Sequence, residues 1–167
     1  MAGTVQLWGR FGASPGSTGH LNAHVHYTDE DSFSSRASSS PIQKPDTGTA
    51  YSFERYIFFK CAVAPDNQFT NFRIWSPITS SIAAGIAYKV GTTNTYADPI
   101  VTKSTKAMRL FHSTYTTYAS GLRLYQTLNN VNDVTNYAVV QVNITNAAAS
   151  GNADSTRTII QASWDSS

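Results

Sequence analysis

Residues Tyr51 to Val63 have the sequence YSFERYIFFKCAV, in which apolar and polar side chains alternate over most of the length. The odd-numbered positions carry most of the apolar set, whereas Ser52 and Glu54 occupy even-numbered positions. Because successive side chains of a strand point to opposite faces of a sheet, this alternation predicts a strand with one buried face. A turn at Pro65 to Asn67 and a second aromatic stretch, Phe69 to Trp75, follow, so we expect a hairpin.

Shorter stretches with the same alternation recur along the chain, and almost no segment has the period of a helix. Residues 12–19 are rich in Gly and Ser, which predicts a loop, and residues 113–121 suit either a short helix or a loop. Several short strands between polar turns predict an all-β fold, an antiparallel β-sandwich or jelly roll. Further strands are expected at Val5–Phe11, Leu21–Tyr27, Ser81–Val90, Arg109–Phe111, Leu122–Leu124, Ala138–Ile144 and Thr156–Trp164.

Length and charge restrict the classes of function. The 167 residues suit one domain, which we place at residues 1–167. Charged residues make up 13% of the chain, against about 25% in an average domain, and the formal net charge of +2 comes from scattered Lys and Arg. Without a basic run we expect no nucleic-acid binding. The sequence has no long apolar stretch and no secretory signal pattern, so we expect no membrane association.

Residues Asp29 to Thr49 form a long polar stretch without alternation. Loops of this length are uncommon inside compact domains, so we expect a functional arm, a long loop that binds a partner, or a segment that becomes fully ordered only in an assembly. The carboxylates at residues 29–31 lack the spacing and the Gly of a calcium loop, so we interpret them as a solvated turn. The residues that we select for subunit contact are Asp29, Asp31, Phe33, Arg36, Pro41 and Pro45.

The sequence favours no catalytic chemistry. It has no His-Glu-x-x-His helix and no phosphate-binding Gly loop. The single cysteine, Cys61, lies on the apolar positions of its strand, where a small buried side chain is expected rather than a reactive thiol. We therefore expect a protein that is not an enzyme and has no cofactor.

Three histidines are the metal candidates of the chain. His20, His24 and His26 alternate, so an unbroken strand would point their imidazoles to one side, within reach of a divalent cation. No acidic ligand lies nearby on that face, and solvent-facing strand positions accept His readily. We therefore expect no bound metal and retain the three residues as candidates.

Arg55 and Arg73 lie in the two best-defined strands, where a cation is unusual. Glu54 is a poor partner for Arg55 because neighbouring strand residues point to opposite faces. Three interpretations stay open: the arginines reach solvent at the sheet edge, one forms a structural ion pair, or one contacts a neighbouring subunit.

The segment YSFERYI, residues 51–57, followed by FTNFRIW, residues 69–75, resembles a family of small virion proteins of tailed bacteriophages. In that family a Ser-aromatic-acid-base-aromatic strand precedes a strand with an Asn-x-Arg/Lys-x-aromatic ending. YAVVQVNI, residues 137–144, and the stretch Thr156 to Asp165 are similar to its last two strands. The resemblance implies a β-sandwich building block of the particle. Residues 29–49 and the stretch Tyr115 to Tyr118 depart from the family pattern, and these are the parts that would set its location.

Two functional classes follow. The first is a virion structural protein, assembled in the host cytoplasm as a homo-oligomer. We expect it to be a capsid decoration or cement subunit on the major capsid protein, with a neck, tail or baseplate position as the alternative. The second is a lectin-like carbohydrate-binding module, with a host glycan as the partner. Its sugar platform would come from Trp8, Trp75, Trp164 and Tyr115 to Tyr118.

Overall fold

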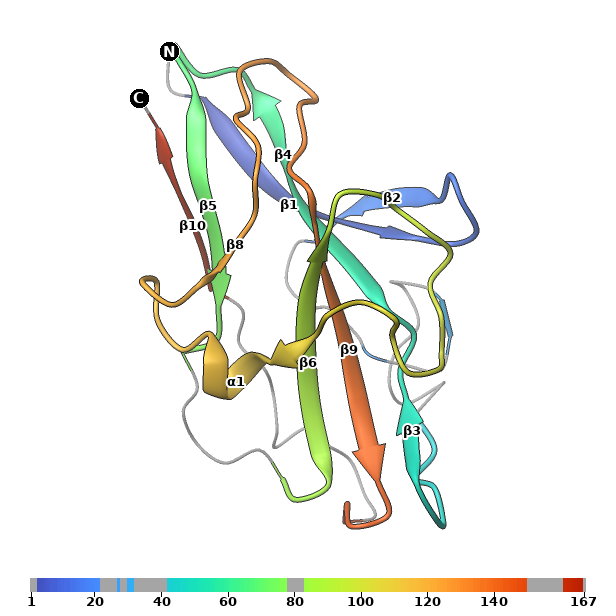
Figure 1. The fold of residues 1–167 in the computed structure, drawn as a ribbon. Helices are drawn as coiled ribbons and strands as arrows, with labels where there is room; N and C mark the ends of the chain where they lie inside the picture. The colour runs from blue at the N-terminus through green and yellow to red at the C-terminus, as the bar shows by residue number, and fades with distance from the viewer. Residues whose placement is uncertain are drawn as a thin grey trace.

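The computed structural model describes residues 3–21, 27, 30–31, 42–77, 83–149 and 161–166, and these form an all-β, sandwich-like fold of antiparallel sheets (Figure 1). The strands are β1 (Thr4–Phe11), β2 (Ser17–His20), β3 (Thr49–Tyr51), β4 (Arg55–Val63), β5 (Phe69–Trp75), β6 (Ile86–Thr93), β7 (Arg109–Leu110), β8 (Leu122–Arg123), β9 (Tyr137–Thr145) and β10 (Gln161–Ser166). The helix α1 (Phe111–Thr114) lies between β7 and β8. Over the described residues, no helix is long and apolar enough to cross a membrane.

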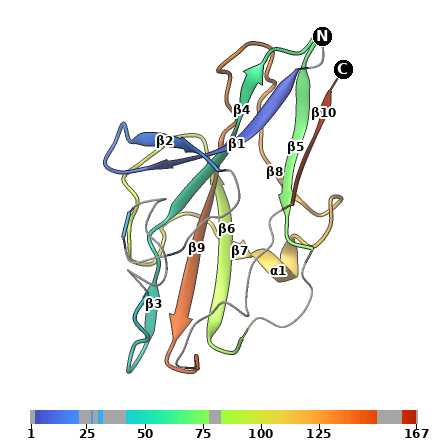
Figure 2. The same ribbon diagram turned by 180° about the vertical axis from the view of Figure 1, so that it is seen from behind.

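The strands divide into a larger and a smaller sheet. The larger sheet has the order β2-β1-β4-β9-β6-β7, with β3 paired to β9, and the smaller sheet has the order β10-β5-β8. The smaller sheet lies over one end of the larger one, whereas β3 and the far ends of β6 and β9 extend beyond it (Figures 1 and 2). The start of β1 and the end of β10 lie at the same end of the molecule (Figure 2).

The expected hairpin of β4 and β5 is wrong, because the two strands belong to different sheets. β4 pairs with β1 and β9, and β5 pairs with β8 and β10. Their apolar faces meet across the sandwich, where the rings of Phe59 and Phe72 lie 5.0 Å apart. Hairpin partners would turn those faces to the same side, whereas strands of opposite sheets bury them against each other.

The main core fills the space between the sheets. Cys61 is fully buried there, as expected, and burial raises the pKa of its thiol, which keeps it protonated and unreactive. The core contains inward-facing side chains of β4, β5, β6, β9 and α1 and of the connections, among them Ile57, Phe59, Phe69, Phe72, Ile74, Val90, Phe111, Leu124, Leu128, Val140 and Val142.

β4 is buried on its second face as well, which the sequence-based expectation of one buried face did not include. Tyr56 and Phe58 form a separate cluster with Tyr137 and Val139 of β9. Residues 94–108, which connect β6 to β7, run across this outer face and contribute Tyr96 and Met108 to the cluster. We call residues 94–108 the strap.

A β-bulge reverses the alternation within β5. Two residues, Asn71 and Phe72, stand opposite the single Trp164 of β10, and Asn71 has a φ of 58°. Asn tolerates this left-handed conformation better than most residues. Before the bulge the odd-numbered Phe69 is buried, and after it the even-numbered Phe72 and Ile74 are buried. Arg73 therefore lies on the outer face.

Other boundaries also differ from the predicted ones. The long first stretch is interrupted at residues 52–54, which separates β3 from β4. The expected loop at residues 12–19 contains β2, since Ser17 to His20 pair with β1 in a hairpin. Of the strand expected at residues 21–27, the structure describes Leu21 and Tyr27, and neither is in a strand.

We predict that Phe59→Ala lowers the free energy of unfolding by about 3–5 kcal/mol, because it removes a buried ring and leaves a cavity between the sheets. Tyr125→Ala is the control, since this ring is 59% exposed and its loss should change stability by less than about 0.5 kcal/mol. Urea unfolding of the two variants measures both values. Equal stability of Phe59→Ala and Tyr125→Ala would contradict the assigned core.

Candidate functional site

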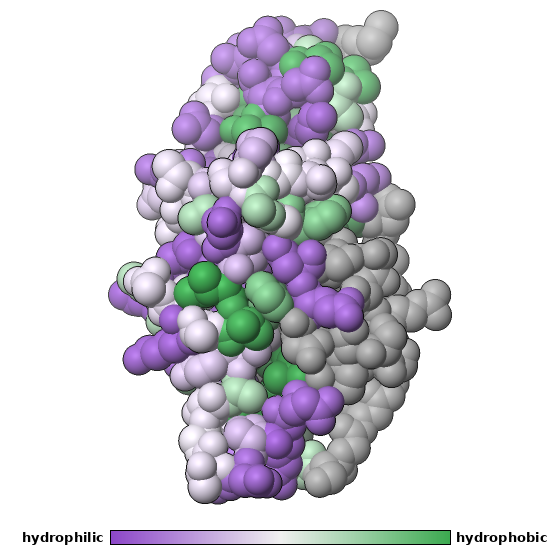
Figure 3. All heavy atoms as spheres, turned by 90° about the vertical axis from the view of Figure 1, so that its right-hand side faces the viewer, coloured by the Kyte–Doolittle hydropathy of each residue, from purple (hydrophilic) through white to green (hydrophobic). Residues whose placement is uncertain are grey.

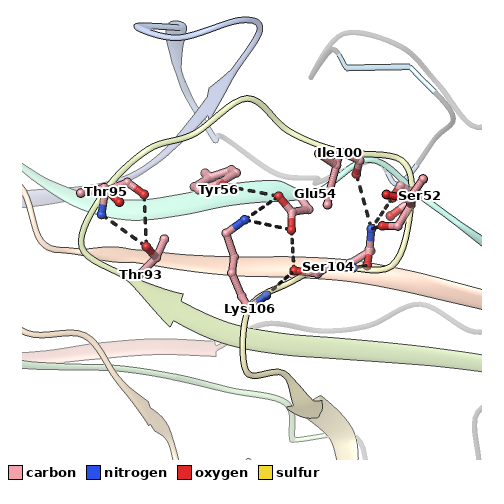
Figure 4. A network of polar contacts seen from close by, with 10 residues as sticks. Ser52, Glu54, Tyr56, Thr93, Thr95, Ile100, Ser104 and Lys106 are labelled. Carbon is pink, nitrogen blue, oxygen red and sulfur yellow. Dashed lines mark hydrogen bonds and ion pairs between the residues drawn. The ribbon is translucent and has the colours of Figure 1, made fainter.

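A buried ion pair fixes the strap on the larger sheet (Figure 4). Glu54, directly before β4, is fully buried, and its Oε2 lies 2.8 Å from Nζ of Lys106. The hydroxyl of Ser104 donates to the other carboxylate oxygen, and the hydroxyl of Tyr56 donates to Oε2 at 3.3 Å. A charge-assisted set of this kind leaves neither buried oxygen of Glu54 unpaired.

Gln141 satisfies the backbone of the strap. Its side-chain Nε2 donates to the carbonyls of Ser52 and Thr102 at 3.0 and 2.7 Å, and its Oε1 accepts from the amide of Ser104 at 3.0 Å. The amide of Glu54 donates to the carbonyl of Ile100 at 3.1 Å. Buried backbone groups need such partners, and these hydrogen bonds join the strap to the larger sheet (Figure 4).

The protonation states of this cluster indicate a structural role. Burial alone would lower the pKa of Lys106, but hydrogen bonds to Glu54 and Tyr56 and the attraction of the carboxylate raise it above its usual value. Burial raises the pKa of Tyr56. Both groups therefore keep their protons through neutral pH, which suits a fixed clamp and not an acid or base that exchanges protons.

Arg55 forms a structural ion pair, one of the three interpretations left open by the sequence. Its side chain is fully buried, Nη2 donates to the carbonyl of Glu30 at 2.6 Å, and Nη1 lies 3.6 Å from Oδ1 of Asp31. The other oxygen of Asp31 accepts from the amide of Gly12 at 2.8 Å. The start of the polar stretch is thus anchored to β4 and to the β1–β2 hairpin.

Desolvation is the largest influence on both partners of this pair. Burial raises the pKa of Asp31, against the effect of the Gly12 amide and the Arg55 guanidinium, and burial lowers the pKa of Arg55, against the attraction of Asp31. Loss of water therefore opposes the charged form of both partners. Asp31 is only partly exposed, at 20% of its side chain, so the solvated turn expected at residues 29–31 does not describe it.

Two motifs with catalytic residue types lie in structural positions. Ser76 Oγ is 3.0 Å from Nδ1 of His112, but Ser76 is fully buried, so its hydroxyl is closed to a substrate. Residues Gly12 to Gly16 have the Gly-x-Ser-x-Gly spacing of a nucleophile elbow. They lie in the turn between β1 and β2, whereas an elbow joins a strand to a helix.

The metal candidates are described only in part. His20 is exposed at the end of β2, and its ring lies 5.8 Å from that of Trp8. His24 and His26 fall outside the described residues, so a joint metal site of the three histidines stays a prediction. Within the described ranges, no group of three His, Cys, Asp or Glu side chains could hold a metal ion.

The arm candidates are also described in part. Asp31 is anchored by Arg55, and Pro45 is half-buried in the segment that leads to β3. The candidates Asp29, Phe33, Arg36 and Pro41 lie outside the described residues.

An apolar groove borders the end of the polar stretch of residues 29–49, which we call the arm region. It has a volume of about 390 Å³, and its lining includes Ile42, Ala50, Tyr51 and Val101. Val101, on the strap, is 41% exposed. Figure 3 looks onto the side of the molecule that carries β2 and β3 and shows apolar atoms gathered at mid-height between polar ones. The arm region and the strap thus meet at one apolar surface.

The aromatic side chains predicted as a sugar platform do not form one surface. Trp8 belongs to the outer cluster, with Nζ of Lys60 4.5 Å from its ring, and Trp164 contacts the buried ring of Phe59 at 5.9 Å. Trp75 and Tyr118 do lie together, with ring centroids 5.7 Å apart.

Comparisons with protein-family models, with curated proteins and with solved structures found no match to this chain.

We predict that Asp31→Asn lowers the free energy of unfolding by about 3 kcal/mol, because it leaves the buried guanidinium of Arg55 without its carboxylate. Adding Arg55→Met should recover most of this loss, since the double variant buries no unpaired charge. Chemical denaturation of both single variants and the double variant measures the coupling. Additive losses would contradict a coupled pair.

We predict that the cost of Lys106→Met depends on alkaline pH. The pKa of Lys106 is raised by folding, so its stabilising charge is fully present below its usual value of 10.5 and is lost as pH rises through the higher folded pKa. The stability difference between wild type and Lys106→Met should therefore shrink at strongly alkaline pH. Denaturation across this range, with the exposed Lys103→Met as control, tests it; a constant difference would refute it.

Proposed function

We propose that this protein is a structural subunit of a virus particle and that it works by binding other protein subunits, as a capsid decoration or cement protein. A neck, tail or baseplate position of the same particle is the alternative. The resemblance of residues 51–57, 69–75, 137–144 and 156–165 to small bacteriophage virion proteins supports the class. The low content of charged residues, 13%, also supports it, because few charges must lose water when subunits associate.

The observation that carries the proposal is the apolar groove of Ile42, Tyr51 and Val101. An apolar surface between polar ones is the usual form of a protein-binding site. The groove lies where the anchored strap meets the segment before β3, so its walls are held in place before a partner arrives. Such preorganisation reduces the entropy lost on association.

A carbohydrate-binding module is the second candidate function. It is favoured by exposed aromatic rings in the connections on either side of β8, where Tyr118 is 38% and Tyr125 is 59% exposed. Tyrosine rings with accessible faces are the groups on which sugar rings stack. The two functions are compatible, because the groove and this sheet face use different residues.

We predict that Val101→Asp reduces co-sedimentation of the purified protein with particles of the virus that encodes it by at least about tenfold, since a carboxylate in the groove must lose its water on binding. Val131→Asp is the matched control, because Val131 is 52% exposed and does not line the groove. Circular dichroism verifies that both variants fold.

Separate capsid and tail fractions distinguish a decoration subunit from a neck or tail subunit. If the wild-type protein bound to neither the capsid nor the tail fraction, the structural role would be refuted. Equal binding by the Val101→Asp and Val131→Asp variants would refute the groove as the contact surface.

A further inference from the structure

Two arginines stand directly opposite each other on the outer face of the smaller sheet, the face that does not contribute to the core. Arg73 of β5 pairs in register with Arg123 of β8. Their neighbours Ile74 and Leu122 point into the core, so both arginines point outward. Like charges directly opposite each other destabilise a sheet, so this pair calls for a reason other than folding.

Each guanidinium is held by a tyrosine ring. Arg73 lies 5.2 Å from the ring centroid of Tyr118 and donates to the carbonyl of Ala119 at 3.0 Å. Arg123 lies 5.5 Å from the ring centroid of Tyr125 and forms no hydrogen bond or ion pair within the described residues. Arg123 thus keeps all its donors available, with an exposed ring beside it.

A polar cleft of about 330 Å³ adjoins this pair, and its lining includes Asn71, Arg123, Tyr125 and Gln126. Asn71 and Gln126 have φ values of 58° and 136°, unusual for residues other than glycine. Asn71 is fixed by its amide, which donates to the hydroxyl of Tyr118 at 2.8 Å and to the carboxylate of Asp165 at 2.9 Å. Strained backbone beside a polar cleft is a feature of binding sites.

We propose that this face binds an acidic glycan, with a sugar carboxylate on the guanidinium of Arg123 and the pyranose ring against Tyr125. A planar guanidinium binds a carboxylate through two parallel hydrogen bonds, and the tyrosine ring offers a flat apolar surface to the sugar. Within the described strands of the smaller sheet, two arginines and one carboxylate, Asp165, carry charge, and this excess of positive charge favours a negative ligand. The inference gives the second candidate function a site and a ligand class, and it holds whether or not the protein belongs to a particle.

The test measures binding of the full chain to matched pairs of acidic and neutral sugars: sialyllactose with lactose, and oligogalacturonate with its methyl ester. We expect at least one acidic member to bind at least about tenfold more tightly than its neutral partner. Arg123→Gln and Tyr125→Ala should each weaken that binding by about tenfold. Lys103→Gln removes the same charge from an exposed position of the strap and should leave the binding of the acidic sugar unchanged.

Other results would overturn the inference. Equal affinity for acidic and neutral sugars would support the carbohydrate-binding function but would exclude the proposed carboxylate site at Arg123. If Arg123→Gln and Lys103→Gln weakened sugar binding equally, the net charge of the protein and not a site at Arg123 would explain the binding. Binding of a polyglutamate peptide with dependence on Arg123, and of none of the sugars, would replace the glycan by a protein partner. Particle binding through the groove would be unaffected in each case, so the two proposals fail separately.

Discussion

Burial of both faces at the start of β4 imposes the arrangement of the long connections. Glu54 and Arg55 are adjacent, so their side chains enter opposite faces of the larger sheet, and both are fully buried. Each charge needs a partner from outside its own sheet face. Lys106 brings the strap across the outer face, and Asp31 brings the start of the arm region to the inner face. Two neighbouring residues therefore fix two segments that are distant in sequence.

Alternation along the chain predicted the all-β class and the burial of residues such as Phe59 and Cys61, because it reports which face of a strand is apolar. Alternation does not predict which strands are neighbours in a sheet. We therefore expected β4 and β5 to pair, whereas the structure places them in different sheets, facing each other across the core. The bulge at Asn71 has a sequence signal, the change of apolar parity between Phe69 and Phe72. The pairing of Glu54 with Lys106 has none, because the partners are 52 positions apart in irregular connections.

The anchored connections leave two surfaces that suit different partners. The groove of Ile42, Tyr51 and Val101 is apolar and matches another protein. The face of Arg73 and Arg123 is polar and cationic, with tyrosine rings, and matches a sugar acid. The sequence predicted a sugar platform of Trp8, Trp75, Trp164 and Tyr115 to Tyr118. Arg123 and Tyr125 were not predicted, because an exposed pair at a short strand has no recognisable pattern until the register with β5 is known.

Cryo-electron microscopy of purified particles from the source that encodes this chain tests the proposed structural role most directly. The proposed role requires density that fits the sandwich on the shell, or at the neck or tail, with the β3 side against a neighbouring subunit. It also requires the outer face of the smaller sheet to be open to solvent. Absence of such density, or a subunit seated with the Arg73–Arg123 face against its neighbour, would contradict the assignment of the two surfaces.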